Sequence, residues 1–229
     1  MNQTRLLAHA VLAAAALTSS AGCVVLRRPT TLPPADKPYV AVLSGEMPEP
    51  ITMVARHAWI VANVADRGRP LLRYELLSRA FKDTTSRPLD YFGEGDVALH
   101  GIVEKDRGSI QKIVECLDEE TPRYNEEHPD YWPMPGPNSN TYVDQMLRRC
   151  DIPIDLPSTA IGKDYRGPIG VSLTSGGTGV QFDTWIAGVK LGLTEGVELH
   201  VLGLTIGVDW WPPALILPVN PGRLGFDDR

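Results

Sequence analysis

The last third of the chain constrains the fold most strongly. Residues 169–209 alternate glycine with β-branched and aliphatic side chains, and residues 197–202 follow the turn signal Thr194-Glu195-Gly196. Glycines in such a segment mark bulges or tight bends between short strands. The pattern predicts several short strands or hairpins, and it shows no repeat of the kind that signals a solenoid.

The preceding part of the chain mixes strand and helix patterns. Four short runs are rich in the residues that strands favour: residues 39–43, 57–62, 71–77 and 97–103. Apolar side chains then follow the i, i+3, i+4, i+7 spacing of an amphipathic helix: Ile110, Ile113, Val114 and Leu117. Loops are expected over residues 83–94 and 119–137, and a second helix is expected to begin near Asn138. The sequence therefore predicts an α+β fold, with a small antiparallel sheet and packed helices before the glycine-rich β segment.

Length and charge narrow the class of protein. The chain has 229 residues, enough for one domain with a substantial core, which we expect over residues 39–217, with a tail over 218–229. The formal net charge is −6 and no basic run stands out, which argues against nucleic acid as a partner. No apolar run reaches the roughly 18–20 residues of a membrane-spanning helix.

The first 22 residues have the pattern of a secretory signal. Arg5 is followed by a short apolar stretch and then by small residues, as in signals for export. Ser20-Ala21-Gly22-Cys23 resembles the bacterial lipobox, with Ser20 where that pattern usually has an aliphatic residue. The resemblance implies that Cys23 is diacylated, becomes the mature N-terminus and binds the lipid bilayer. The alternative is an ordinary cleavage site beside an incidental cysteine.

The residues after Cys23 refine this expectation. Val24, rather than Asp, follows the cysteine, which resembles cargo sent to the outer membrane of a host that has one. Residues 23–38 are rich in proline and predict a semi-extended tether. In an exported protein, Cys116 and Cys150 meet an oxidising compartment, so they either pair in a disulfide or remain two buried thiols.

Two short stretches together suggest a catalytic site. His57 lies in a predicted strand, and Ser139 lies where the second helix is expected to begin. A helix N-terminus stabilises an oxyanion, and a nearby His can act as base for a Ser nucleophile. Glu75 on the next strand is the candidate that orients the imidazole, with Tyr74 as the alternative on the opposite face. The competing interpretation makes Asn138 or Ser139 an N-cap and His57 a half-buried strand histidine.

Several stretches also resemble a bacterial family known as domain of unknown function 3750. They are 56–60, 136–142, 159–165, 176–181 and 193–199. This resemblance, over about residues 39–217, implies an uncharacterised envelope protein and no particular activity.

A second resemblance implies a hydrolytic activity. Residues 138–142, Asn-Ser-Asn-Thr-Tyr, resemble the start of the catalytic helix in circularly permuted papain-like proteins of the NlpC type, with Ser139 in place of the catalytic Cys. Such a site would cut an amide or ester in peptidoglycan, a peptide or a lipid. Five side chains are expected to support the site: Asn138, Asn140, Trp59, Lys163 and Asp164. No cofactor is expected, and no metal, because His100 and His128 lack the spacing of metal ligands.

Three functions remain open at this point. The first is a surface-tethered hydrolase that uses Ser139, His57 and Glu75. The second is a non-catalytic envelope module that binds a ligand or a partner in the same cleft. The third gives the main role to the glycine-rich β segment, as a surface that contacts the membrane or another envelope protein. Large exposed apolar residues alternating along its strands would favour the third.

Overall fold

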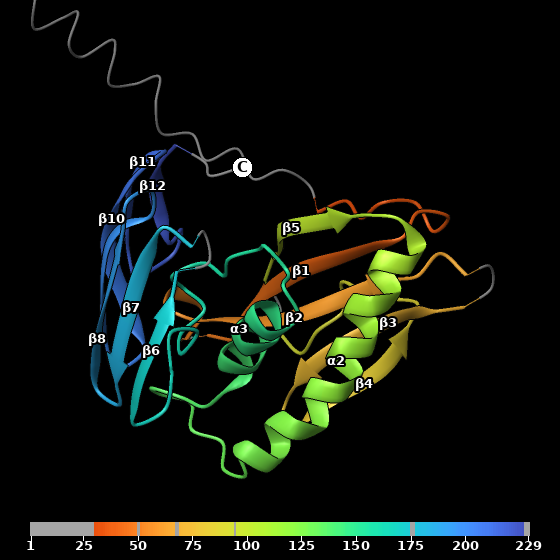
Figure 1. The fold of residues 1–229 in the computed structure, drawn as a ribbon, viewed down its shortest axis with the longest axis horizontal. Coiled ribbons are helices and arrows are strands. Elements are labelled where there is room, and N and C mark those ends of the chain that lie inside the picture. Colours follow the sequence, from red (N-terminus) through yellow and green to blue (C-terminus); the bar gives the residue numbers. More distant parts are fainter. Residues whose placement is uncertain (1–29, 50, 67–68, 94, 175–176, 227–229) are drawn as a thin grey trace, which may run out of the picture.

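The computed structural model describes residues 30–49, 51–66, 69–93, 95–174 and 177–226. Two antiparallel sheets and two helices make up this part of the chain, which confirms the predicted α+β class. Figure 1 shows the second sheet standing to one side of the first sheet and its helices. The predicted signal, the acylated Cys23 and residues 24–29 of the tether lie outside the described residues.

The first sheet has the strand order β4-β3-β2-β1-β5. Its strands are β1 (Tyr39–Glu46), β2 (Arg56–Asn63), β3 (Leu71–Leu76), β4 (Ala80–Thr85) and β5 (Val97–Glu104), with a short 3₁₀ helix, η1 (Ile51–Met53), before β2. Every residue of β2 is buried. Because side chains alternate along a strand, Ala58 and Ile60 join the core under the helices, whereas Trp59 and Val61 join a second core on the opposite face.

The two helices, α2 (Arg107–Glu127) and α3 (Ser139–Arg149), cover one face of this sheet. Asp106 caps α2, and the predicted apolar stripe is buried. The expected loop over residues 119–137 is wrong in its first half, because α2 continues to Glu127 through Pro122. Buried contacts extend the helix: the Thr121 and Tyr142 hydroxyls lie 2.8 Å apart, and the rings of Tyr124 and Tyr142 meet edge to face.

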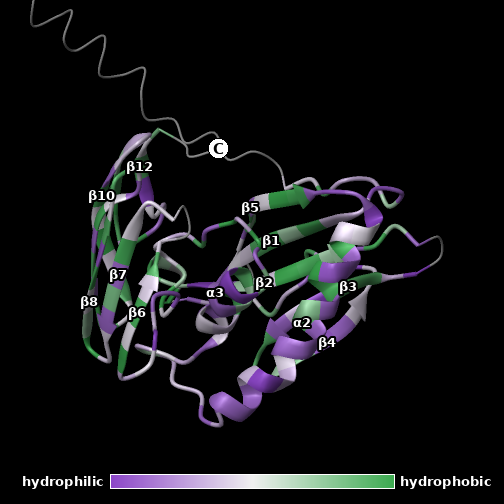
Figure 2. Cartoon of the chain, viewed as in Figure 1, coloured by the Kyte–Doolittle hydropathy of each residue, from purple (hydrophilic) through white to green (hydrophobic). Residues whose placement is uncertain are grey.

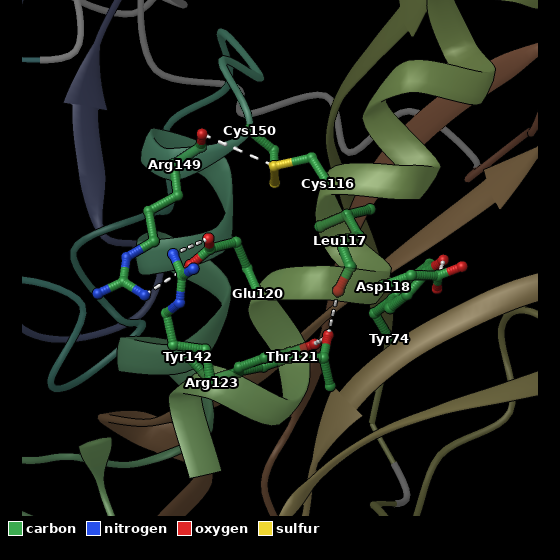
Figure 3. Close-up of a disulfide and its surroundings, with 10 residues drawn as sticks. All are labelled: Tyr74, Cys116, Leu117, Asp118, Glu120, Thr121, Arg123, Tyr142, Arg149 and Cys150. Carbon is green, nitrogen blue, oxygen red and sulfur yellow. Dashed lines mark hydrogen bonds and ion pairs between the residues drawn. A yellow bond between two sulfur atoms is a disulfide. The ribbon is translucent and has the colours of Figure 1, made fainter. Parts of the chain in front are cut away.

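A disulfide joins the two helices. Cys116 on α2 bonds to Cys150, the C-cap of α3, across 34 residues of sequence. Figure 3 shows this bond beside Arg149, which pairs with Glu120 on α2. The helix pair is therefore held by a covalent bond and by ion pairs in addition to its apolar core.

The second sheet is an antiparallel meander in which each strand pairs with the next. Its strands are β6 (Ile169–Leu173), β7 (Gly179–Thr184), β8 (Ala187–Gly192), β9 (Gly196–Val201), β10 (Leu204–Trp210), β11 (Pro213–Ile216) and β12 (Arg223–Gly225). Strands β6 to β10 agree with those predicted from residues 169–209, whereas β11 lies beyond that segment and β12 lies within the expected tail. Tight turns join the strands, and Gly196 (φ 83°) and Gly203 (φ 82°) supply the positive φ that such turns need.

Candidate functional site

The structure brings His57 and Glu75 together on the face of the first sheet that lies away from the helices. His57 Nε2 lies 2.6 Å from Glu75 Oε1, and Arg73 Nε donates to Glu75 Oε2 at 2.7 Å. Burial works to raise the pKa of Glu75, but the hydrogen bonds with His57 and Arg73 outweigh it and hold the pKa below its usual value. Tyr74, the alternative to Glu75, points to the helix side, where its hydroxyl donates to Asp118.

Aromatic side chains cover this His–Glu pair. The His57 ring lies 4.8 Å from the ring of Phe92 and 6.1 Å from that of Trp59. The Trp59 indole N–H donates to the carbonyl of Pro88 and so ties the covering loop down. His57 is only 3% exposed. The pair is therefore buried and hydrogen-bonded, and the structure leaves the imidazole little access to a substrate.

The residues before α3 attach the helix to the first sheet. Asn138 is the N-cap and accepts hydrogen bonds from the N–H groups of Asn140 and Thr141, and the Thr141 hydroxyl reciprocates by accepting from the Asn138 N–H. The Asn140 side chain accepts a hydrogen bond from the Ala58 N–H at 3.0 Å and donates one to the Arg56 carbonyl at 2.9 Å. It therefore binds the backbone on both sides of His57. The motif therefore has a structural role that accounts for both asparagines.

Ser139 makes no hydrogen bond to the His–Glu pair within the described residues. It is the first residue of α3, and the next residue, Asn140, bonds to the backbone on both sides of His57. A cavity of about 330 Å³ lies between β4 and α2, lined by residues other than these three. Of the three predicted catalytic side chains, the structure thus brings two together.

Lys163 and Asp164, expected to support that site, belong instead to a second cluster. We call it the inner ion network: Lys163, Asp164, Asp183, Glu198 and His200, all buried. Lys163 Nζ lies 2.8 Å from Asp164 Oδ2, and His200 Nδ1 lies 2.6 Å from Asp183 Oδ1. The network fills the space between the inward face of β7–β10 and the segment after α3.

No sequence motif pointed to the other members of this network as site residues. Asp183, Glu198 and His200 occupy alternate positions on β7 and β9, and all three are buried, while their strand neighbours are more exposed and, apart from Thr184, apolar. The same period-two pattern that predicted the strands would have placed these charged residues on one face. The pattern does not indicate that the face of the sheet with the charged side chains is the buried one.

Three atoms of the network resemble a cation site. Oxygens of Asp164 and Glu198 and a ring nitrogen of His200 lie within 4.8 Å of one another. Among the residues that the structure describes, neither Glu198 Oε2 nor His200 Nε2 has a hydrogen-bond partner. The Lys163 ammonium, however, lies 2.8 Å from Asp164 Oδ2 and 3.7 Å from Glu198 Oε2. A divalent cation would have to displace this charge, so we assign the cluster to internal ion pairing.

The inner ion network should make stability depend on pH. Burial works to lower the pKa of His200, but the charge of Asp164 and the hydrogen bond to Asp183 outweigh it and raise the pKa to about 9. A folded-state pKa above the unfolded value of about 6.5 means that the stabilisation is complete below pH 6.5 and is lost as the pH rises to 9. We expect the free energy of unfolding to fall by on the order of 3 kcal/mol across that interval.

Urea unfolding measured from pH 6 to pH 10 tests this expectation. The control is His200→Gln, which keeps a polar side chain and removes the titration. That variant should be less stable at pH 6 and should lose most of the slope between pH 6.5 and pH 9. An unchanged slope in His200→Gln would assign the pH dependence to other groups.

The outward side of the second sheet is apolar. Every outward side chain of β6–β10 is aliphatic or aromatic except Thr184, and we call this surface the outer sheet face. Cross-strand pairing aligns one row of these side chains across all seven strands: Leu173, Val180, Leu191, Val197, Val208, Leu215 and Leu224. Figure 2 shows hydrophobic residues along β6, β7 and β10.

Most of these apolar side chains are exposed, whereas Val189, Val197 and Leu204 are half-buried. Val171 is 72% exposed, Leu173 67% and Leu199, at the centre of the sheet, 51%. The sheet therefore has the reverse of the usual arrangement, because it buries charged side chains and exposes apolar ones. A monomer in water rarely exposes an apolar patch of more than a few hundred Å², and larger patches mark surfaces that bind a protein or a membrane.

Among the described residues, no helix is long and apolar enough to span a bilayer. The chain has no match among the curated proteins and none among the solved structures. One family model does match, over residues 38–165, which include the first sheet, both helices and Lys163 and Asp164. The expected resemblance extended to residue 217, but this match ends before the second sheet. Because it covers more than half of the chain, the protein belongs to the family described as protein of unknown function DUF3750.

Proposed function

We propose that this protein is a lipid-anchored, non-catalytic module of the bacterial cell envelope that binds an apolar partner surface through its outer sheet face. The observation that carries the proposal is the exposure of aligned apolar rows on a sheet whose other face is filled with charged side chains. Exposing so much apolar surface to water is unfavourable by roughly 25 cal/mol per Å², so a partner that covers the face is stabilising.

The proposed anchor would keep this face near a membrane. Cys23 lies seven residues before Thr30, the first described residue, and seven extended residues span about 25 Å at most. Acyl chains on Cys23 would therefore hold the folded part close to the bilayer surface, in the outer membrane if the host has one. A tethered module meets other envelope components at high effective concentration, which favours docking.

A hydrolase with a circularly permuted papain-like fold is the second candidate. It is favoured by the contact between His57 and Glu75 and by the hydrogen bonds of Asn140 to the backbone beside His57. Its nucleophile would be Ser139, and its substrate an amide or ester in peptidoglycan, a peptide or a lipid. We place it second because the nucleophile and its base need hydrogen-bond contact, and among the described residues no hydrogen bond links Ser139 to His57.

The docking function can be tested by cysteine accessibility in isolated envelopes. Leu199→Cys places a thiol on the outer sheet face, and Leu77→Cys places one at an equally exposed site, 50% against 51%, just after β3. The native cysteines interfere little, since Cys116 and Cys150 form a disulfide and Cys23 is expected to be acylated. We expect a water-soluble maleimide to label Leu199→Cys several times more slowly than Leu77→Cys, with equal labelling after denaturation.

Two results would contradict the proposal. Equal labelling of the two cysteines in intact envelopes would mean that nothing covers the outer sheet face. Covalent capture of Ser139 by an active-site phosphonate, lost in Ser139→Ala, would restore the hydrolase as the first candidate.

A further inference from the structure

We propose that the outer sheet face binds the same face of a second copy of this chain, so that two seven-stranded sheets pack as a sandwich. The inference rests on the proposed function, because it names the partner of the docking surface. The two copies would be related by a two-fold axis that lies between the sheets, as in most homodimers.

The area of the face suits such a dimer. Seven strands spaced about 4.8 Å apart, with about five residues each on average at 3.3 Å per residue, give a face of roughly 30 Å by 17 Å. Protruding side chains raise its accessible area above this flat value, toward the roughly 800 Å² per partner of a stable interface. A twisted sheet of this size also packs naturally on another twisted sheet, at about 10 Å separation.

The distribution of charge permits the two faces to meet. The outward positions of β6–β10 carry no charged side chain, and the charged side chains of these strands point inward. Lys190 and Glu198, for example, pair with each other on the inner side. Two copies can therefore approach through these faces without placing like charges in contact, although the chain has a net charge of −6.

The edges of the sheet favour a second copy over the hydrocarbon of a bilayer. Within the described residues, β6 forms one edge of the sheet and β12 the other, so each has backbone N–H and C=O groups without a strand partner. In hydrocarbon such groups have no water to bond, at a cost of several kcal/mol each. A sheet-on-sheet dimer buries the faces and leaves both edges in water. Segments that lie on membranes also carry Lys and Arg beside their apolar face, and here those outward positions carry none.

The strand order predicts which residue lies at the centre of the dimer. β9 is the middle strand of seven, so either orientation of a two-fold axis in the plane between the sheets places β9 opposite β9. Leu199 lies near the middle of β9 and pairs with Val189 on one side and Ile206 on the other. Leu199 of one copy should therefore lie close to Leu199 of the other.

Photo-crosslinking in the native envelope tests this arrangement. Two differently tagged full-length chains are produced together, and one carries the substitution Leu199→p-benzoylphenylalanine. Illumination should give an adduct of two chains that contains both tags. The same group at Leu77, exposed to the same degree and away from the second sheet, should give none. Retention of the Cys116–Cys150 disulfide and resistance to protease show that each variant is folded.

The remaining outcomes separate this inference from the proposed function. An adduct with a different protein, or with lipid alone, would overturn the second copy as partner and leave docking in place. A folded variant that gives no adduct while Leu199→Cys remains protected from maleimide would also overturn the dimer. Equal maleimide labelling of Leu199→Cys and Leu77→Cys would remove the docking function itself.

Discussion

Replacing Asp164 by alanine is expected to lower the free energy of unfolding by about 3–5 kcal/mol, because it leaves buried charges without their partner. Asp164 is 5% exposed and accepts hydrogen bonds from Lys163 Nζ and from Thr205 Oγ1, the latter at 2.7 Å. His200 Nε2 lies 3.6 Å from the same carboxylate. Chemical denaturation at pH 7, followed by circular dichroism, gives the difference directly.

A matched control separates this effect from the loss of an ordinary ion pair. Glu104 forms an ion pair with Lys37 in which both side chains are about half exposed. Glu104→Ala should cost under about 1 kcal/mol, as exposed pairs do. Asp164→Asn should fall between the two, since it keeps hydrogen-bonding capacity and loses the charge. A loss below 1 kcal/mol for Asp164→Ala would mean that Lys163 and His200 find other partners or water.

Removing the disulfide should also have a large effect. The double variant Cys116→Ser, Cys150→Ser frees a loop of 34 residues, and loop-closure entropy then predicts a loss of about 4 kcal/mol. Unfolding of the natural chain with and without a reductant provides the comparison. The reduced natural chain and the double variant should unfold at the same denaturant concentration, and the oxidised chain should unfold at a higher one.

One result would contradict the expected stabilisation by the disulfide. If a reductant shifts the natural chain no more than it shifts the double variant, the bond contributes nothing to stability. The ion pairs between α2 and α3, such as Glu120 with Arg149, would then hold the helices together.

Local patterns predicted much of the fold. The spacing of Ile110, Ile113, Val114 and Leu117 placed α2, because a helix stripe depends only on sequence period. The strand β4 was missed, because its central residues, Lys82 to Thr84, are polar and exposed at the edge of the sheet. The length of α2 was underestimated for a related reason, since its last turns are held by contacts with α3 that no local pattern contains.

Local patterns also predicted one part of the candidate site and missed another. Period two on neighbouring strands suggested Glu75 as the partner of His57, and the structure brings the two together. No local pattern determines which face of the sheet α3 covers. That choice follows from packing: Ala58 and Ile60 meet the helix, and His57 and Trp59 meet the loop that carries Phe92.

The sequence alone established the periods of an amphipathic helix and of alternating strands, and it offered Asn138 or Ser139 as the cap of the second helix. Each of these depends on residues a few positions apart, whose relative directions are set by backbone geometry. Only the tertiary structure decided which side of each element is buried. In the second sheet that decision turned the charged side chains inward, where Lys163 and Asp164 pair with them, and left the apolar rows on the exposed side.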